Sequence, residues 1–483
     1  MLSITVACLL FSPALSPGLE QLTVKGTQIV NPAGETVPLR GVNFGGWLML
    51  ETWISGIERE WDDRLREMAD ETGVRPELDA AFKALGKWDD DTEPILDHIG
   101  RLHQALRDNA KDKPGPLAAY FALYDAEPPI FAAHDFDRVL RDRFGDGGAQ
   151  QVWDLYHDTW LTERDFQLAA ALGFTFVRLP FWYRWFEDDD RPGEYRDYGF
   201  KYLDRAVEWA AKHRLYLMPD FHGAPGGQSP WDHTGELSRN EFFTCDACLR
   251  RTAALWEAIA ARYRDNPAVF AYDTLNEPFS AKDLDDWVRV QDTLYRAIRR
   301  GDPDGIVVME DGYKLESMPW MMTGFFPKPE EHGWENVVYS FHFYSGSGHE
   351  KRAAQVARIA RREQDRCGAP LYAGEFSTMS GTPEGLDGMR VYCSLFNREG
   401  WMWSPWTFKY VDGEGKGAMW GVYRHDGPWR TPNIHRDSLE DILAAIRRMD
   451  TANFTLHPGY GNVLRECLTQ PWAPPPGQNA RKP

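Results

Sequence analysis

The stretch VFAYDTLNEP (269–278) decides the fold of this chain, because the rest of the sequence repeats its pattern. It begins with a short, mostly apolar run and ends in the polar group Asn276-Glu277-Pro278. An amphipathic helical pattern precedes it at about 249–264. A short apolar run that follows a helix is typical of a parallel strand that helices bury on both faces. We therefore expect Glu277 at the C-terminal edge of a parallel sheet.

Seven further apolar runs occur along the chain, at 39–46, 174–181, 215–223, 305–312, 337–344, 370–377 and 401–409. Helical patterns separate them, at about 198–213, 249–264, 283–300, 350–366 and 385–398. A turn at Asn31-Pro32-Ala33-Gly34 indicates a small hairpin before the first run. Eight βα units are the number in the α/β architecture called the (β/α)8 TIM barrel, which is the fold we expect.

The spacing is irregular after the first strand, where more than a hundred residues precede the second. Residues 57–133 are charged and helix-prone, so we expect a long helical excursion after strand one, leaving the barrel at its C-terminal face. The barrel domain is then expected over 19–450, including this insertion. A Pro-rich C-terminal tail at 451–483 is expected to wrap the surface or to fray.

The composition limits the partners of this barrel. Its formal net charge of -19, from 73 acidic and 54 basic residues, disfavours nucleic acid and anionic membrane surfaces. A neutral small molecule or polymer is the more natural partner. The 20 Trp and 19 Tyr residues supply flat faces that suit the C–H surfaces of sugars, although packing between helices and barrel accounts for at least half of them.

Two short features concern the cellular compartment. Residues 2–12 form an apolar run followed by small residues and Pro13, as in a secretory signal, although no Lys or Arg precedes the run. We expect a signal segment over 1–18 and a secreted or periplasmic protein, the alternative being a frayed N-terminal strand. Outside this segment five cysteines remain, and Cys245-x-x-Cys248 indicates a local disulfide or two loop thiols in preference to a zinc site.

Ionisable residues close most of the apolar runs, and parallel strands bring such residues to one mouth. The fourth run ends at Glu277 and the seventh at Glu375. Glycoside hydrolysis requires two such carboxylates, because one protonates the leaving oxygen while the other attacks the anomeric carbon or activates water. Strands four and seven face each other, which is compatible with the ~5–5.5 Å separation of retaining enzymes. We expect the charge of Glu375 to raise the pKa of Glu277, and Arg178 to stabilise the charge of Glu375.

Several motifs resemble glycoside hydrolase family 5, in which the catalytic glutamates lie on strands four and seven. The family resemblance rests on Asn276-Glu277-Pro278 and on Gly374-Glu375-Phe376. Three longer stretches resemble its exo-β-1,3-glucanase group: LRGVNFGGWLMLETWI (39–54), HDTWLTERDFQLAAALGFTFVRLPFWY (157–183) and HGAPGGQ (222–228). The resemblance covers about 21–55 and 134–410. The large insertion and Ser-Pro-Trp-Asp at 229–232 depart from the group's pattern.

This resemblance implies roles for individual residues. Glu277 matches the acid/base, Glu375 the nucleophile and Asn276 the residue that binds the sugar 2-hydroxyl. Glu51 matches a carboxylate that binds hydroxyls of the terminal glucose. The remaining residues that match the group's shell around the sugar are Arg178, His222, His342, Tyr344 and the platform tryptophan Trp406, with Trp403 as its substitute. His222 and His342 could be read as metal ligands, but the sequence places no acidic cluster with them, and we expect no metal.

We therefore expect a retaining, exo-acting β-glucosidase or β-1,3-glucanase that acts on a neutral β-glucoside or β-glucan and needs no cofactor. An endo-acting β-glycanase of the cellulase or mannanase type is the first alternative. A non-catalytic carbohydrate-binding barrel is the second, and the presence of Glu277, Glu375, Arg178 and Tyr344 disfavours it, because binding alone needs no matched acid and nucleophile. A metal-dependent barrel hydrolase is the weakest alternative.

Overall fold

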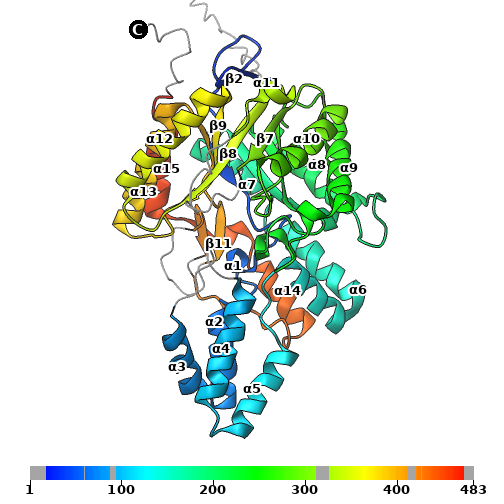
Figure 1. Ribbon diagram of the computed structural model, residues 1–483, viewed down its shortest axis with the longest axis vertical. Helices are drawn as coiled ribbons and strands as arrows, with labels where there is room; N and C mark the ends of the chain where they lie inside the picture. Colours follow the sequence, from blue (N-terminus) through cyan, green and yellow to red (C-terminus); the bar gives the residue numbers. More distant parts are fainter. Residues whose placement is uncertain are drawn as a thin grey trace, which may run out of the picture.

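The computed structural model describes residues 18–472 except 59, 87–93, 312–325, 412–419 and 426. Its main sheet holds eight parallel strands in the order β10-β9-β8-β7-β6-β5-β4-β3, seen in Figure 1. The strands are β3 (Gly41–Asn43), β4 (Phe176–Trp182), β5 (Tyr216–Gly223), β6 (Ala271–Asp273), β7 (Ile306–Glu310), β8 (Val337–Tyr344), β9 (Leu371–Ser377) and β10 (Met402–Trp403). A parallel bridge between Arg40 and Trp403 joins the two edges and closes the barrel. The predicted (β/α)8 barrel is confirmed.

The barrel interior is filled by two chemically different layers. The layer nearer the N-terminal ends of the strands is apolar and contains Leu39, Phe176, Met218, Ile306, Val308, Val338, Tyr372 and Met402. Residues two apart on a strand point to the same side, so the next interior position on β4 after Phe176 is Arg178, and on β5 after Met218 it is Asp220. The apolar layer therefore supports a buried charged layer just below the mouth.

Helices cover the outside of the barrel. They are α7 (Glu163–Leu172), α8 (Asp197–Lys212), α9 (Asp246–Tyr263), α10 (Leu284–Gly301), α11 (Pro329–His332), α12 (His349–Cys367) and α13 (Pro383–Glu399). The predicted runs at 174–181, 215–223, 337–344 and 370–377 form strands over most of their length, whereas 269–278 contributes only β6. The remainder of that run, from Thr274 to Pro278, lies at the mouth.

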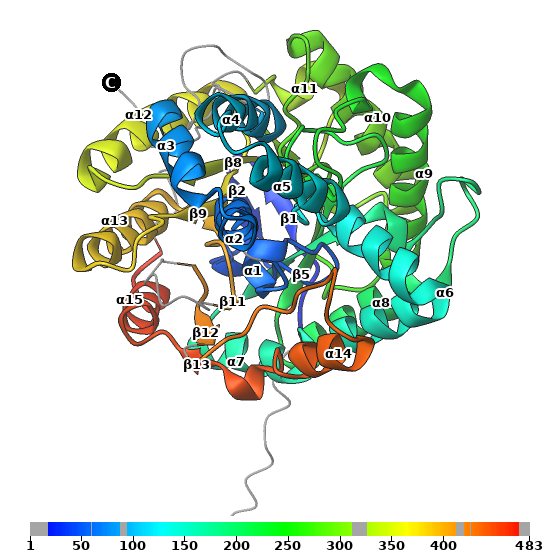
Figure 2. The same cartoon turned by 90° about the horizontal axis from the view of Figure 1, so that it is seen from below.

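The predicted excursion after the first strand is helical. It contains α1 (Thr52–Ser55), α2 (Trp61–Thr72), α3 (Arg75–Leu85), α4 (Ile95–Asn109) and α5 (Pro114–Ala126), and it leads into α6 (Ala133–Thr159). Helices α2–α5 form a lobe beyond the barrel, on the side opposite the hairpin of β1 (Thr23–Lys25) and β2 (Gln28–Val30) (Figure 1). In the view from that side, α1 and α2 stand in front of the middle of the barrel (Figure 2).

The lobe has its own small hydrophobic core, made of Leu65, Met68, Ala69, Val74, Leu78, Ala81, Ile95, Ile99, Leu102, Leu106, Ala110 and Tyr120. Its return to the barrel is fixed at two places. Glu51 forms an antiparallel bridge with Ala132, and the backbone N–H of His134 donates to the carbonyl of Gly235 in the loop after β5. The insertion is therefore tied to the rim of the mouth.

The described part of the C-terminal region packs on the surface of the barrel, which is one of the two alternatives expected for the tail. Strand β12 (Tyr423–His425) pairs with β11 (Lys409–Val411) and with β13 (Thr455–Leu456), and α14 (Leu439–Arg447) packs on α6. Helix α15 (Pro458–Leu468) packs against α13 and buries Tyr460, Val463, Leu464, Cys467 and Leu468. The barrel domain thus extends past residue 450 to the end of α15, because an amphipathic helix in 458–468 covers apolar surface that α13 would otherwise expose.

A disulfide joins Cys245 and Cys248, which decides between the two alternatives predicted for this pair. Cys367, Cys393 and Cys467 are buried free thiols. The predicted signal segment lies almost entirely outside the described residues. Within the described ranges, no helix combines the length and the apolar character needed to cross a membrane.

Candidate active site

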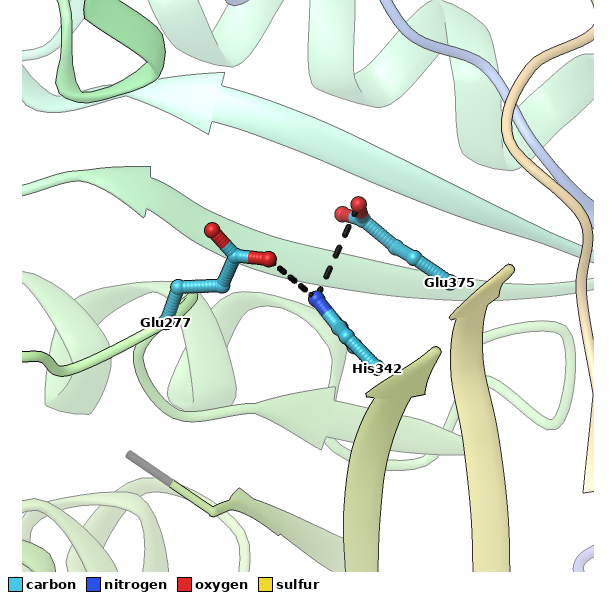
Figure 3. Close-up of side chains that lie close together, drawn as sticks. All are labelled: Glu277, His342 and Glu375. Carbon is cyan, nitrogen blue, oxygen red and sulfur yellow. Dashed lines mark hydrogen bonds and ion pairs between the residues drawn. The ribbon is translucent and has the colours of Figure 1, made fainter. Parts of the chain in front are cut away.

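Glu277, His342 and Glu375 meet at the C-terminal mouth of the barrel (Figure 3). One carboxylate oxygen of each glutamate and a ring nitrogen of His342 lie within 4.8 Å of one another. His342 Nδ1 is 2.7 Å from Glu277 Oε1 and 3.6 Å from Glu375 Oε2. The Glu277 side chain is 35% exposed and that of Glu375 only 6%, so one glutamate is open to solvent while the other is buried.

Strand register explains why His342 and Glu375 are neighbours. They are paired residues of β8 and β9, after a register shift at Phe341/His342. Gly374, just before the glutamate, leaves the space that this requires: a Cβ at that position would lie 2.4 Å from Ser340 Oγ and 2.9 Å from His342 Nε2.

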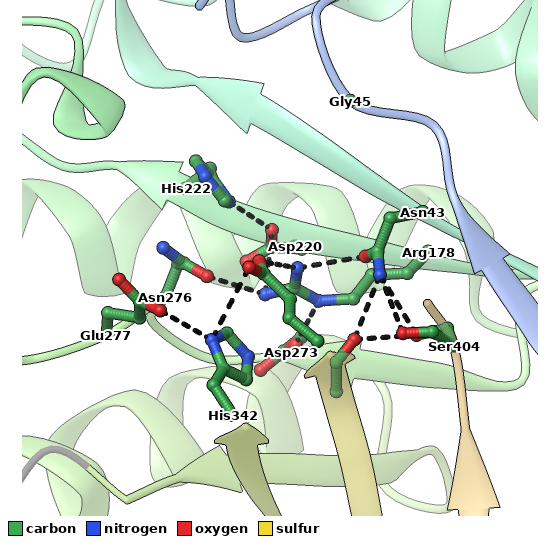
Figure 4. Close-up of polar contacts among 12 residues, drawn as sticks. Asn43, Gly45, Arg178, Asp220, His222, Asp273, Asn276, Glu277, His342 and Ser404 are labelled. Carbon is green, nitrogen blue, oxygen red and sulfur yellow. Dashed lines mark hydrogen bonds and ion pairs between the residues drawn. The ribbon is translucent and has the colours of Figure 1, made fainter. Parts of the chain in front are cut away.

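Arg178 is the centre of the charged layer below the mouth (Figure 4). Its Nη1 donates to Glu375 Oε1 at 2.7 Å and to Asn43 Oδ1 at 3.1 Å. Its Nη2 donates to Asn276 Oδ1 at 2.8 Å. The same guanidinium contacts three more buried carboxylates: Asp220, Asp273 and Glu310. Tyr344 donates its hydroxyl to Glu375 Oε2 at 2.6 Å. Each oxygen of Glu375 therefore accepts a strong hydrogen bond from a fixed donor.

His222 and Trp406 form another wall of the site. Their rings stack with centroids 5.5 Å apart and an interplanar angle of 9°. Trp403, the sequence alternative to Trp406, lies in β10 with its Nε1–H bonded to Asn397 of α13. Trp403 is fully buried behind the barrel wall, so only Trp406 reaches the mouth.

Glu51 lies at the start of α1, where the insertion begins. Its side chain is buried, and its Oε2 accepts the indole N–H of Trp53 at 2.9 Å. Its Oε1 is buried without a hydrogen-bond partner among the described residues. Burial, followed by the charges of Asp232 and Glu375, raises the pKa of Glu51 well above its usual range. A buried carboxylate oxygen without a partner is costly, and a ligand hydroxyl would satisfy it.

The comparisons with known proteins agree with this geometry. Residues 146–412 match the sequence profile of the family described as Cellulase (glycosyl hydrolase family 5). The chain belongs to glycoside hydrolase family 5. It is therefore a glycoside hydrolase, and the resemblance predicted from its motifs is confirmed.

Named relatives of this family 5 enzyme differ in activity. The chain is 28% identical to a β-xylosidase of Phanerodontia chrysosporium, over 86% of this chain and 75% of that protein. It is 30% identical to a probable glucan 1,3-β-glucosidase A of Emericella nidulans, over 70% and 67%. Endoglucanase C of Acetivibrio thermocellus is 31% identical over 40% of this chain and 54% of that protein. A crystal structure of an endogalactoceramidase has the same fold, with a TM-score of 0.51, 18% identity and coverage of 92% and 85% of the two chains.

The protonation of Glu277 differs from the sequence expectation. Burial works against its charge, but the hydrogen bond from His342 and the imidazoles of His233 and His342 outweigh burial and lower its pKa to about 2. The expected rise caused by Glu375 is wrong, because both histidines reach the Glu277 carboxylate, His342 at 2.7 Å and His233 Nε2 at 3.6 Å. Although burial opposes it, Glu310, Glu375 and Glu277 raise the pKa of His342 well above its usual value.

Several site residues of the family 5 enzyme were not singled out from the sequence. Asp220, Asp273, Glu310, Asn43 and His233 all contact a predicted site residue. Asp220 and Glu310 could have been found, because each is an acidic residue near the end of an apolar run, the signal that identified Glu277 and Glu375. His233 gives no such signal. It lies in the loop after β5, and only the folded loop brings it to Glu277.

Two groups of potential metal ligands occur among the described residues, and both coincide with this site. Asp220, Asp273 and Glu310 surround the Arg178 guanidinium, which already supplies the positive charge at their centre. His222 Nδ1 lies 2.7 Å from Asp220, and burial lowers the pKa of His222 to about 3, so the ring is neutral and its orientation is fixed. The structure therefore places acidic residues beside both His222 and His342, which corrects the sequence expectation that no acidic cluster accompanies them.

Proposed function

We propose that this enzyme releases single sugars from the ends of β-glucosides or β-1,3-glucan by a retaining double displacement. The observation that carries the retaining part is the separation of Glu277 and Glu375, whose nearest carboxylate oxygens lie within 4.8 Å. Retaining glycosidases need carboxyl groups about 5–5.5 Å apart, because no water has to fit between the nucleophile and the sugar. Inverting enzymes need about 6.5–9.5 Å.

In the first step, Glu375 attacks the anomeric carbon while Glu277 gives a proton to the departing glycosidic oxygen. Hydrogen bonds from Arg178 and Tyr344 orient the two oxygens of Glu375 and stabilise its charge before it attacks the sugar. The bond from the sugar to the leaving group breaks, and an ester forms between the sugar and Glu375. In the second step, Glu277 takes a proton from water, the water oxygen attacks the anomeric carbon, and the ester bond breaks.

The proton for the first step is held by the pair of His342 and Glu277. The hydrogen bond of 2.7 Å between them, with the low pKa of Glu277 and the high pKa of His342, leaves this proton on the imidazole in the free enzyme. A bound glycoside adds an acceptor next to Glu277. The two groups then titrate as one unit, and the proton passes through the glutamate to the leaving oxygen.

Glu51 supports action at chain ends. Its unpartnered Oε1 is buried, and Ala132, where the insertion returns, is bridged to its backbone. A wall at this position would leave room for one terminal sugar whose hydroxyls bond to the carboxylate. The names of two relatives, a β-xylosidase and a glucan 1,3-β-glucosidase, also favour release of terminal units. Endoglucanase C favours the alternative, cleavage within a glucan chain.

The early product profile on laminarin and on soluble cellulose derivatives tests this proposal. Release of single glucose units, with polymer length falling slowly, is expected. A ladder of mixed oligosaccharides at the first time points would replace the exo-acting function with the endo-acting one. Release of xylose but not glucose from aryl glycosides would move the substrate to β-xylosides.

Glu51→Ala is the matching variant. Leaving one partner of a buried hydrogen bond unsatisfied costs about 1–3 kcal/mol, so kcat/KM on aryl β-glucosides should fall about 5- to 150-fold. Trp53→Phe is the control, because it removes the indole N–H that Glu51 accepts and keeps the carboxylate. Its effect should be the smaller of the two. Equal activity of wild type and Glu51→Ala would contradict the terminal-sugar pocket.

We also propose that the protein works in an oxidising compartment outside the cytoplasm. The Cys245–Cys248 disulfide supports this, because such bonds persist chiefly in exported proteins. Alkylation of the protein taken directly from its native host should leave this cysteine pair unmodified unless a reductant is added first. Modification of both cysteines without reductant would argue for a reducing compartment.

A further inference from the structure

Glu310, the last residue of β7, contacts both halves of the site and is buried from solvent. We propose that Glu310 is a positioning residue for the acid/base Glu277: it fixes the glutamate's backbone and the imidazole of His342 that supplies its proton. This role rests on the proposed double displacement. It would make the protonation of the leaving group depend more strongly than nucleophilic attack on a carboxylate that never touches the sugar.

The first contact is with the backbone of Glu277. Glu310 Oε2 accepts the N–H of Glu277 at 2.7 Å. Glu277 has φ of 43°, in the left-handed region that a residue with a side chain adopts only when its surroundings impose it. Pro278 follows and further restricts the conformation of the residue before it. The Glu277 backbone therefore needs an external acceptor to hold it, and Glu310 is that acceptor.

The second contact is with the groups that serve the two catalytic carboxylates. Glu310 Oε1 accepts a hydrogen bond from Arg178 Nη2 at 2.7 Å. The same oxygen lies 3.4 Å from His342 Nε2. His342 uses its other nitrogen, Nδ1, to reach Glu277 Oε1. Glu310 thus acts on the acid/base from two directions, through its backbone N–H and through the ring that bonds to its carboxylate.

The burial of Glu310 excludes a direct catalytic role. Only 1% of its surface is exposed, and both of its oxygens already accept from protein donors. Its backbone carbonyl accepts the indole N–H of Trp287 from α10, which fixes the end of β7 against the outer helix layer. Glu310 can therefore influence the reaction only through the groups it holds.

The test is Glu310→Gln, with kcat/KM measured across aryl β-glycosides of graded leaving-group acidity. In this variant the amide NH2 must face either the Glu277 N–H or the Arg178 guanidinium, so two donors oppose each other. Loss of general-acid assistance typically costs about 10²–10⁴-fold. We expect a loss of this order on poor leaving groups. On the 2,4-dinitrophenyl glycoside, which departs without a proton, the loss should be no larger than that of a variant that disturbs Arg178 alone.

Asp273→Asn is the matched control. Asp273 is equally buried and binds Arg178 Nε at 2.8 Å, and among the contacts described for the chain it has none with Glu277. The same acid-to-amide change there should alter kcat/KM by a similar factor on every leaving group, because it acts only through the arginine that holds the nucleophile. Glu310→Asp keeps the negative charge and shortens the side chain by one methylene. It replaces Glu310→Gln if the latter does not fold.

The outcomes separate this role from the proposed function. The wild-type enzyme is first assayed on aryl glycosides of glucose, xylose and cellobiose. The variants are then measured on the series that the wild type cleaves. An active wild type whose Glu310 variants lose activity equally on all leaving groups would overturn the positioning role alone. A wild type that cleaves none of the glycosides would overturn both proposals. A loss that is much larger on poor leaving groups in the Glu310 variant, and independent of the leaving group in Asp273→Asn, supports the role.

Discussion

At the scale of single residues, one buried guanidinium faces more negative charge than it can balance. Arg178 contacts Asp220, Asp273, Glu310 and Glu375, and charges buried without compensation are expensive. Burial, only partly opposed by Arg178, raises the pKa of Asp220 to about 7, and it raises the pKa of Asp273 well above its usual range. These two acids can take up protons, which leaves the arginine to stabilise the carboxylates that must stay ionised.

This arrangement predicts the behaviour of Glu375→Ala. Since both chemical steps pass through Glu375, its removal should abolish hydrolysis while the fold remains. Azide or formate should partly restore cleavage of activated aryl glycosides, because a small anion fits where the carboxylate was, and NMR should show a product of inverted configuration. Normal turnover by the variant, or a rescued product of retained configuration, would remove Glu375 from the role of nucleophile.

The sequence predicts those residues of the site that stand at strand ends. Glu277 and Glu375 close apolar runs, and parallel strands of a closed barrel bring such positions together whatever the loops do. The pKa of Glu277 could not be predicted in this way. It depends on His233, 44 positions earlier in a loop whose path no periodicity describes, and on the Nδ1 of His342 lying nearer to Glu277 than to Glu375.

At the scale of elements, long runs are predicted best. β4, β5, β8 and β9 are close to their predicted ranges, because a mostly apolar run of seven or eight residues between two helices leaves little choice. β6 and β10 are short, since the chain leaves the barrel wall early to form the mouth. Helix α15 within the tail was not predicted, because its amphipathic pattern is only 11 residues long and prolines follow it at 474–476.

Helix α15 should contribute to stability as an outer barrel helix does. Leu464 is fully buried against α13, so Leu464→Ala should lower the free energy of unfolding by about 2–5 kcal/mol. Asn462→Ala, at an exposed position of the same helix, is the control and should change it by no more than about 0.5 kcal/mol. Urea unfolding followed by circular dichroism measures both. Equal small effects would mean that α15 is detached in solution, as a fraying tail would be.

At the scale of the whole molecule, acid should destabilise the fold through histidines that are buried in neutral form. Burial lowers the pKa of His157 and of His222 to about 3, and that of His103 to about 4. In the unfolded chain each titrates near 6.5. Between these two pH values each of these imidazoles is protonated in the unfolded state and neutral in the folded state. The stability each neutral ring provides is therefore complete above pH 6.5 and is lost as pH falls toward the folded-state pKa, at about 1.4 kcal/mol per pH unit for each histidine.

His157 allows one of these contributions to be isolated, because it lies in α6, which precedes α7 and β4, and not among the groups of the active site. Its ring is fully buried, stacks on Trp153 and bonds through Nδ1 to the hydroxyl of Tyr198 at 2.9 Å. His157→Phe should therefore flatten the dependence of unfolding free energy on pH between 4 and 6 by about 1.4 kcal/mol per unit relative to wild type. Tyr198→Phe removes the same hydrogen bond and keeps the imidazole, so it should lower stability at every pH with the wild-type slope. Denaturant titrations at several pH values give the three slopes. If the His157→Phe and wild-type curves run parallel, then His157 binds its proton equally in the folded and unfolded states, and the acid sensitivity of this enzyme must come from other groups.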